Sequence, residues 1–273
     1  MEPPHEPYGQ HESDGQHEPY GQHEPYGQHE PYGQHEPYWP HEPYGPHEEV
    51  SRRRPWVVGV SGASGTPYAA AVLRALLAAG EAVDLVVSRA SRLTLLDETG
   101  IAFRDAHWRE DLRRWLSRGA DGTPDAFEVP SGVADVTHWA AGDLAAGPSS
   151  GSYPTKGMLI VPASTACVAG VALGLSKDLL QRAASVTLKE RRRLVVAVRE
   201  TPLNGQTLRH LVTLDEAGAV VLPASPAFYA GATHIQDLVD FVAGRALDAA
   251  GVPHKLYRRW EGELGGDRDR GTA

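Results

Sequence analysis

The chain has 273 residues, a formal net charge of −9 and a single cysteine. One cysteine excludes an internal disulfide and is typical of a reducing compartment, and no apolar run reaches the roughly 18 residues needed to span a membrane. We therefore expect a cytoplasmic protein with neither a membrane segment nor an export signal.

The first fifty residues are a repeat of the six-residue unit HEPYGQ and its variants, which begins at His5. Pro and Gly recur in almost every unit and no aliphatic residue is available for a core, so we predict a disordered tail and linker over residues 1–54. Histidines recur every six residues, but this spacing in a flexible chain preorganises no metal site, and we predict no metal.

The charge of the protein is divided unevenly between this tail and the rest of the chain. Residues 1–50 hold eleven of the 35 acidic side chains and none of the 26 Lys and Arg residues. The remainder therefore has 24 acidic and 26 basic side chains and is nearly neutral. A nearly neutral body does not indicate a surface for nucleic acid or for a membrane.

Short apolar runs alternate with helical patterns from residue 55 onward. The runs are rich in Val, Leu and Ile at successive positions, which is typical of parallel strands covered on both faces. We predict strands at 56–60, 82–88, 157–164, 193–200 and 219–225, and helices at 66–79, 89–99, 165–174, 177–190, 205–210 and 234–249. The pattern predicts one doubly wound α/β domain, Rossmann-like or flavodoxin-like, with a mainly parallel sheet over residues 55–264 and a disordered C-terminus at 265–273.

The first predicted strand ends in the turn SGASG, residues 61–65. This turn lacks the glycine spacing of the dinucleotide motif GxGxxG and of the ATP-binding motif GxxxxGK[ST]. Its glycines allow a tight turn, and a helix that begins near Thr66 directs backbone amides toward an anion, with the Ser64 hydroxyl as a further donor. An ordinary helix cap explains the turn equally well. The sequence VPAST, with Ser164 and Thr165, repeats the arrangement, and two such turns favour a shared ligand.

Charged and aromatic side chains follow in the later segments. Arg182 and Lys189 lie on the same side of a predicted helix. Arg199 and Glu200 come directly after a strand that reads as buried, and buried charges need a partner or a ligand, so we predict a function for this pair. Tyr229 lies in a loop after the last strand, where its hydroxyl can donate to a phosphate.

Together, these segments resemble the UbiX-type flavin prenyltransferases, also described as Pad1-like flavoproteins or aromatic-acid decarboxylase partners. The resemblance rests on GVSGASGTPYAAAVLRAL, PSSGSYPTKGMLIVPAST, LLQRAASVTLKERRRLVVAVRETPL, LPASPAFY and IQDLVDFVAGRALDAAGV, in the family's order. It implies a domain that binds FMN and, without a metal, transfers a dimethylallyl group from dimethylallyl phosphate or its pyrophosphate to N5 and C6 of the reduced flavin. It also implies delivery of the prenylated FMN to a UbiD-type decarboxylase, and a homo-oligomer, often a dodecamer, with active sites at subunit interfaces.

The resemblance further implies roles for individual residues. Flavin contacts are implied for Gly62, Ala63, Ser64, Ser88, Ser164, Thr165, Ala166, Cys167 and Arg199. Contacts with the prenyl phosphate are implied for Tyr229 and Arg245, and catalytic or lining roles for Lys189, Glu200, Arg182, Glu98 and Trp260. The leaving phosphate gains negative charge as the allylic C–O bond breaks, so these cations and the tyrosine hydroxyl would stabilise it while Glu200 relays a proton.

One departure and two alternative functions accompany this resemblance. Cys167 stands where relatives commonly have Thr, and a thiol is the weaker hydrogen-bond donor. A non-catalytic FMN carrier for a decarboxylase would need the two turns but not Lys189, Glu200, Tyr229 and Arg245 together. A flavin-dependent cysteine decarboxylase shares the fold but has a catalytic His and a PxMNxxMW-like segment, which PASTACVAG does not match.

Overall fold

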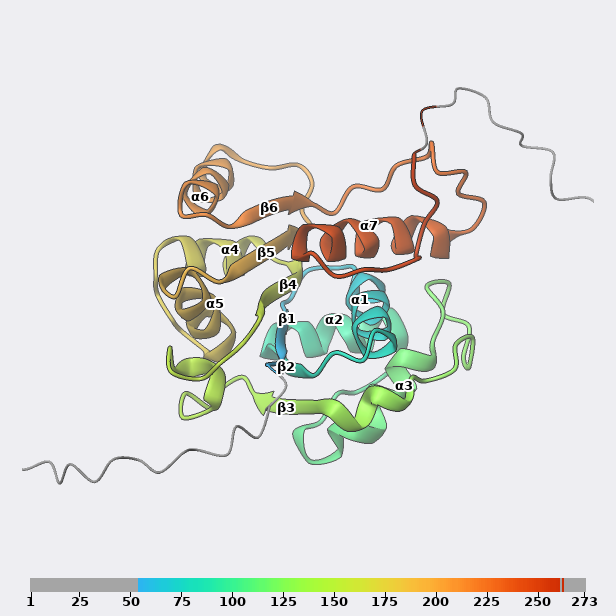
Figure 1. Cartoon of the computed structure of the whole chain (residues 1–273), viewed down its shortest axis with the longest axis horizontal. Helices are drawn as coiled ribbons and strands as arrows, with labels where there is room; N and C mark the ends of the chain where they lie inside the picture. The colour runs from blue at the N-terminus through green and yellow to red at the C-terminus, as the bar shows by residue number, and fades with distance from the viewer. Residues whose placement is uncertain (1–53, 261, 263–273) are drawn as a thin grey trace, which may run out of the picture. The chain divides into compact units, whose positions relative to one another are not determined.

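The computed structural model describes residues 54–260 and residue 262, and strands alternate with helices along almost all of this part (Figure 1). The predictions of a disordered tail and a disordered C-terminus fall largely outside the described residues. The strands are β1 (Trp56–Val60), β2 (Val83–Val87), β3 (Val136–Ala140), β4 (Gly157–Ala163), β5 (Arg193–Val198) and β6 (Val220–Pro223). The α-helices are α1 (Thr66–Ala78), α2 (Arg89–Thr99), α3 (Trp108–Ser117), α4 (Thr165–Ala172), α5 (Leu179–Lys189), α6 (Gly205–Glu216) and α7 (Ile235–Ala250). Three 3-10 helices are η1 (Asp105–His107), η2 (Ser131–Asp135) and η3 (Gly147–Ser149).

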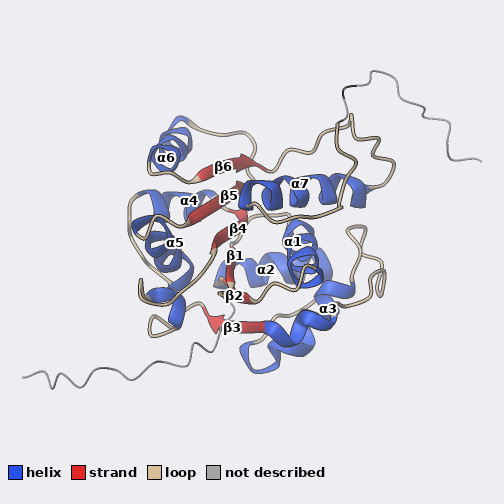
Figure 2. Ribbon diagram, in the orientation of Figure 1, coloured by secondary structure: helices blue, strands red, loops and turns tan. Residues whose placement is uncertain are grey.

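The six strands form one sheet in the order β3-β2-β1-β4-β5-β6, and every pairing in it is parallel. Helices α1 and α7 lie on one face of this sheet and helices α4 and α5 on the other (Figure 2). Successive side chains of a strand point to opposite faces, so β1 supplies Val58 to one apolar core and Val57 to the other. The predicted doubly wound α/β fold is therefore confirmed.

The strand order reverses direction between β1 and β4, which are neighbours in the sheet. Strands β2 and β3 are added on one side of β1, and strands β4, β5 and β6 are then added on its other side. Turns that follow two neighbouring parallel strands meet at the same edge of the sheet, and ligands of open α/β sheets bind at such a switch point. The two serine turns predicted from the sequence follow these two strands.

Side chains at the helix N-termini explain where several helices begin. Ser88 accepts a hydrogen bond from the amide of Ser91 at 3.1 Å, and Asp178 accepts one from the amide of Gln181 at 2.9 Å. Asn204 accepts a hydrogen bond from the amide of Thr207 at 2.8 Å at the start of α6. Each cap satisfies an amide that has no partner inside its helix.

The predicted elements agree with the structure except for one strand and one helix. Strand β3 pairs with β2 alone and has polar and half-exposed residues after Val136, so the sequence shows no continuous apolar run there. Helix α3 buries Leu112, Trp115 and Leu116 within a strongly charged segment. The predicted helix at 205–210 continues to Glu216.

Candidate active site

A pocket of about 710 Å³ opens at the switch point between β1 and β4. It lies between the ends of the first two strands, the start of α4 and the start of α5. Its volume is within the range of small-molecule and cofactor sites. The lining residues include five of the predicted flavin contacts, namely Gly62, Ser88, Ser164, Ala166 and Cys167.

The two turns at the base of this pocket are joined by hydrogen bonds through Ser61. Its hydroxyl donates to the carbonyl of Pro162 at 2.9 Å and accepts from the amide of Ser164 at 2.7 Å. The side chain of Ser61 is buried, so these bonds are shielded from water. Next to it, a Cβ on Gly62 would lie 2.5 Å from the Cβ of Ala90, and only glycine allows α2 to approach this closely. The sequence marks Ser61 as a polar residue at a strand end, but it was not among the predicted flavin contacts.

The N-terminus of α1 is occupied by a carboxylate of the protein itself. Glu98, on α2, accepts hydrogen bonds from the amide of Gly65 at 2.9 Å, the amide of Thr66 at 2.8 Å and the hydroxyl of Thr66 at 2.6 Å. Burial raises the pKa of Glu98, but these hydrogen bonds and one with the Ser64 side chain outweigh it and lower the pKa below its ordinary value. The expectation that the α1 amides receive a ligand anion is corrected, because Glu98 is the anion at that position.

Of the remaining predicted flavin contacts, Ala63 is buried within the turn, Ser64 is exposed beside Glu98 and Thr165 is half-buried at the start of α4. Arg199 is half-buried directly after β5, and its Nε is shielded from solvent with no hydrogen-bond partner among the described residues. A guanidinium nitrogen in this condition is ready to donate to a ligand.

Arg199 also interacts electrostatically with Tyr68 on α1. Burial raises the pKa of the Tyr68 hydroxyl, with Arg199 acting to lower it and Glu98 to raise it. Glu200, in contrast, is exposed and accepts a hydrogen bond from the amide of Thr201 at 2.9 Å. The premise that both charges are buried therefore applies to Arg199, which is partly buried, but not to Glu200, which is exposed.

Cys167 lines the pocket as a neutral thiol. Its side chain is buried, and desolvation raises the pKa of the thiol to about 12. Its backbone amide donates to the hydroxyl of Ser164 at 3.3 Å. A thiol that stays protonated near neutral pH is not a nucleophile, so this residue contributes shape and a backbone amide.

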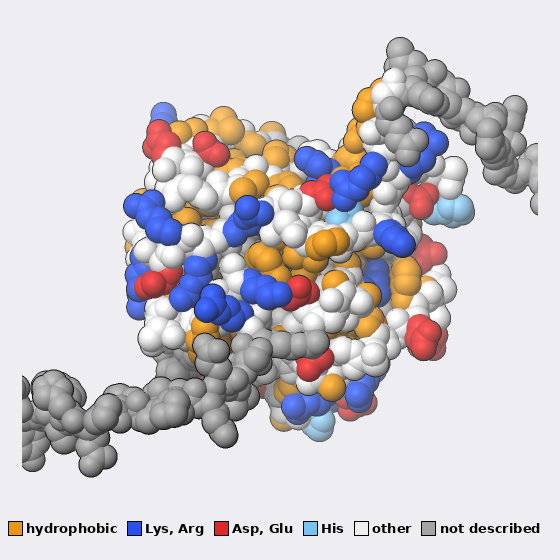
Figure 3. Space-filling model, viewed as in Figure 1, with side chains coloured by type: hydrophobic (Ala, Val, Ile, Leu, Met, Phe, Trp, Pro, Cys, Tyr) orange, Lys and Arg blue, Asp and Glu red, His pale blue; other side chains and the backbone are white. Residues whose placement is uncertain are grey.

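Lys189 ends α5, away from this pocket, whereas Arg182 lies in the first turn of α5, next to Gln181, but does not line the pocket. Helix α5 begins at the pocket with Asp178 as its cap, and a helix of eleven residues is about 16.5 Å long at 1.5 Å per residue. Arg182 donates from Nε to the carbonyl of Ser149 at 3.0 Å, and Lys189 forms an ion pair with Glu190. Lys and Arg side chains gather on this part of the surface (Figure 3). Arg192 donates to the carbonyl of Gly151 at 2.7 Å, in the same loop as Ser149.

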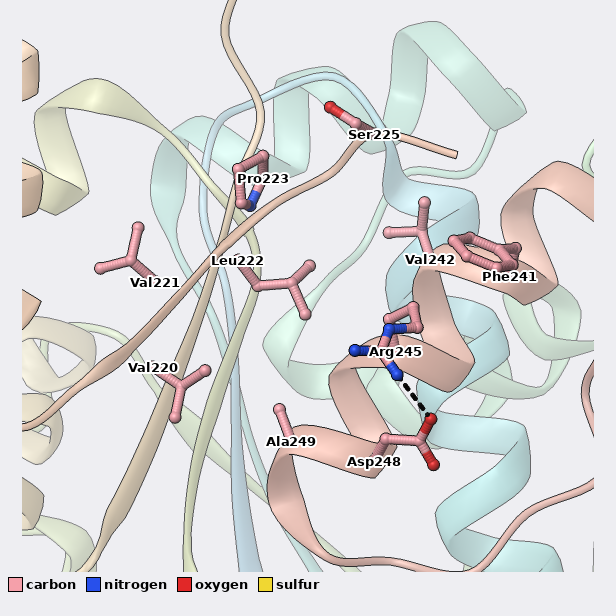
Figure 4. A pocket seen from close by; sticks show the side chains of 10 residues that line it. All are labelled: Val220, Val221, Leu222, Pro223, Ser225, Phe241, Val242, Arg245, Asp248 and Ala249. Carbon is pink, nitrogen blue, oxygen red and sulfur yellow. Dashed lines mark hydrogen bonds and ion pairs between the residues drawn. The ribbon is translucent and has the colours of Figure 1, made fainter. Parts of the chain in front are cut away.

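Tyr229, Arg245 and Trp260 form a third group around α7, on the opposite face of the sheet from α5. The rings of Tyr229 and Trp260 meet edge to face with centroids 6.0 Å apart. Arg245 lines a second pocket, of about 540 Å³, between β6 and α7, and its guanidinium bonds to Asp248 (Figure 4). The predicted site residues thus fall into three groups within one copy of the chain.

Sequence reasoning also missed the side of the first pocket formed by α5. Lys177, Asp178 and Gln181 line it, and the side-chain oxygen of Gln181 accepts from the amide of Lys177 at 3.1 Å. The signal was the polar turn SKD before a helix.

Among the residues that the structure describes, no group of three His, Cys, Asp or Glu side chains is arranged to hold a metal ion. Within the same part of the chain, no helix combines the length and apolar character needed to cross a membrane.

Comparison with known proteins shows which proteins this chain is similar to. The family model named Flavoprotein matches residues 45–247. A flavin prenyltransferase UbiX from Streptomyces coelicolor is 86% identical over 217 residues, which are 80% of this chain and 100% of the relative. The flavin prenyltransferase UbiX of Synechocystis is 40% identical over 215 residues, covering 78% of this chain and 99% of the relative.

Two solved structures share the fold at substantial sequence identity. A crystal structure of AnUbiX (PadA1) in complex with FMN and dimethylallyl pyrophosphate matches with 35% identity and a TM-score of 0.65, over 78% of this chain and 100% of that one. A dodecameric FMN-dependent UbiX-like decarboxylase from Escherichia coli O157:H7 matches with 32% identity and a TM-score of 0.64, over 76% and 99% of the two chains.

Proposed function

Because this chain belongs to the UbiX flavin prenyltransferase family, we propose that it transfers a dimethylallyl group from dimethylallyl phosphate to reduced FMN. The product is prenylated FMN, alkylated at N5 and C6. The observation that carries this function is the switch-point pocket, which combines the family's two turns with a volume suited to a mononucleotide. When bound, reduced FMN supplies the electron-rich ring that is alkylated.

The residues of the pocket fit FMN. Helices α2 and α4 both begin at its wall, at Ser88 and Ser164, and helix N-termini favour negatively charged groups. The buried Nε of Arg199 offers a further donor. We infer that these groups, with the turn at Gly62, hold the flavin, while the neutral thiol of Cys167 packs against it.

The prenyl phosphate requires cations because negative charge builds on it as the C–O bond breaks. We assign this role to Arg182, Lys189 and Arg245, with a hydrogen bond from the Tyr229 hydroxyl. We assign proton transfer between phosphate and flavin to Glu200, whose carboxylate is exposed and bonded to the neighbouring amide of Thr201, and we assign Trp260 to lining the prenyl site. Glu98 holds the α1 turn in place beside them.

A complete site on this scheme needs more than one copy of the chain. Lys189 lies at the end of α5 and Arg245 on α7, and these helices cover opposite faces of the sheet (Figure 2). A dodecameric structural neighbour supports a homo-oligomer, and we propose a dodecamer in which subunit interfaces bring these residues together. We also propose that the reaction takes place in the cytoplasm and that a UbiD-type decarboxylase receives the product.

The function is tested with purified protein, reduced FMN and dimethylallyl phosphate under anaerobic conditions. We expect mass spectrometry to find flavin heavier by one C5H8 unit. Unchanged FMN at saturating occupancy would show that the protein is a carrier. Lys189→Ala should abolish product but retain FMN, whereas Arg113→Ala, an exposed change on α3, should leave both intact.

A further inference from the structure

Asp248 is the centre of a hydrogen-bond network that includes one of the proposed phosphate ligands. Its Oδ2 accepts from Nη1 of Arg245 at 3.2 Å and from the hydroxyl of Tyr257 at 2.5 Å. Its Oδ1 accepts from Nη2 of Arg259 at 2.7 Å and bonds to Nε2 of His254 at 3.0 Å. Four side chains from α7 and from the segment after it therefore meet on one carboxylate.

This network fixes the C-terminal segment, residues 252–260, on helix α7. The side chain of His254 is almost fully buried, with 2% of its surface exposed. A Cβ on Gly244 would lie 2.6 Å from atoms of both His254 and Tyr257, so the glycine is what allows the segment to lie directly on the helix backbone. The position of the segment thus depends on Gly244 and on the Asp248 carboxylate together.

The same segment supports the aromatic residues proposed to surround the prenyl phosphate. The ring of Tyr257 packs on Phe241 with centroids 4.9 Å apart, and Phe241 meets Tyr229 at 5.8 Å. Tyr229 in turn meets Trp260. A contiguous chain of contacts therefore runs from Asp248 through Tyr257 to the two aromatic residues of the site.

We propose that Asp248 is a positioning residue for prenyl transfer, which holds the Arg245 guanidinium and the C-terminal segment in the geometry that receives the substrate phosphate. This inference rests on the proposed function. Asp248 balances part of the charge of Arg245 and Arg259 and restricts the rotamers of Arg245, so less order has to be gained when the phosphate binds. Figure 4 shows Arg245 joined to Asp248 at the edge of the pocket between β6 and α7.

The electrostatics of the network agree with this role. Burial raises the pKa of Asp248, but hydrogen bonds from Arg259, Tyr257 and His254 outweigh it and bring the pKa well below its ordinary value. The carboxylate therefore stays ionised under assay conditions. Arg245 has its own pKa raised, first by its hydrogen bond with Tyr257, so it stays a cation.

The test compares Asp248→Asn with wild type in steady-state prenyl transfer, with FMN held at saturation. We expect KM for dimethylallyl phosphate to rise by about tenfold, a typical coupling between residues in contact, while kcat changes little and FMN affinity is unchanged. Asp240→Asn is the matched control, because Asp240 is a half-buried carboxylate on the same helix that bonds to Gln236 instead. It should leave KM unchanged.

A double-mutant cycle separates positioning from general destabilisation. In an Arg245→Lys background, which keeps a cation but loses the guanidinium that Asp248 orients, Asp248→Asn should add little to KM if it acts through Arg245. A KM unchanged by Asp248→Asn in the wild-type background would overturn the inference, and an equal rise in both backgrounds would overturn the claim that Asp248 acts through Arg245. Wild-type protein that forms no prenylated flavin would instead refute the proposed function, so the two failures are distinguishable.

Discussion

Glu98 links the packing of two helices to the chemistry of the turn beside them. Its carboxylate sits on α2 and binds the amides that open α1, so a single side chain joins the helices that follow β1 and β2. A negative charge at a helix N-terminus is favourable because it meets the positive end of the helix dipole. The turn at 61–65 is consequently fixed at its first residue, where Ser61 bonds to the amide of Ser164, and at its last residue, where the amide of Gly65 bonds to Glu98.

We predict that Glu98→Gln lowers the free energy of unfolding at neutral pH by about 1 to 2 kcal/mol, because an amide accepts weaker hydrogen bonds than a carboxylate. The pKa of Glu98 is lowered in the fold, so its contribution is present above the ordinary value of 4.5 and is lost as the pH falls below it. Denaturant unfolding at pH 7 and pH 4 measures this. The wild-type and variant stabilities should converge toward pH 4, and a constant difference would contradict the assignment.

Cys167 provides a second prediction for a single residue. With a buried thiol and a pKa of about 12, iodoacetamide should label the native protein very slowly at pH 7.5. The same protein unfolded in guanidinium should be labelled within minutes, which makes it its own control. Rapid labelling of the folded protein would show that the pocket wall opens or that the thiol is ionised.

At the scale of single elements, a helix cap contributes a measurable part of the free energy of unfolding. Asn204 caps α6, and its side chain oxygen accepts from the amide of Thr207. We predict that Asn204→Ala lowers the free energy of unfolding by about 1 kcal/mol, whereas Asn204→Asp, which keeps the acceptor, changes it little. Prenyl transfer should be unaffected, since no predicted site residue lies on α6. A loss of activity in both variants would place α6 in the site.

Most elements could be predicted from the sequence because apolar runs and turns coincide with them. The strands β1, β2, β4 and β5 are buried along nearly their whole length, and this produces the unbroken Val, Leu and Ile runs. β3 escaped prediction because an edge strand needs fewer apolar residues. Helix α3 was not predicted, although its buried residues recur at helical spacing.

The site was predictable only in part, because the sequence does not show which polar groups bind each other. Ser164 and Gly62 were found through their turns, and both line the pocket. The same reasoning left the α1 amides open for a ligand, and nothing local indicates that Glu98, more than thirty residues later, binds them. The network of Asp248 likewise depends on a segment folding back onto its own helix.

For the whole molecule, a further prediction concerns removal of the N-terminal repeat from the rest of the chain. All eleven acidic residues of the repeat precede Val50, and the UbiX relative from Streptomyces coelicolor aligns over its full length to 217 residues of this chain. We predict that a chain starting at Val50 keeps the kcat, the KM and the melting temperature of the full protein. Its charge near +2 should greatly weaken retention on an anion exchanger. A large fall in kcat would show that the repeat takes part in catalysis.

The separation of Lys189 from Arg245 within one copy allows a test of how the site is assembled. Lys189→Ala and Arg245→Ala each remove one phosphate ligand, so each homo-oligomer should be inactive. If a site takes Lys189 from one copy and Arg245 from another, an oligomer co-assembled from both variants contains some complete sites, about a quarter with random mixing. We expect prenylated FMN from the co-expressed mixture, and none when the two purified oligomers are combined without subunit exchange. Failure of the co-expressed mixture would mean that both residues of a site belong to the same copy, and that a movement of α5 or α7 within that copy has to bring them together.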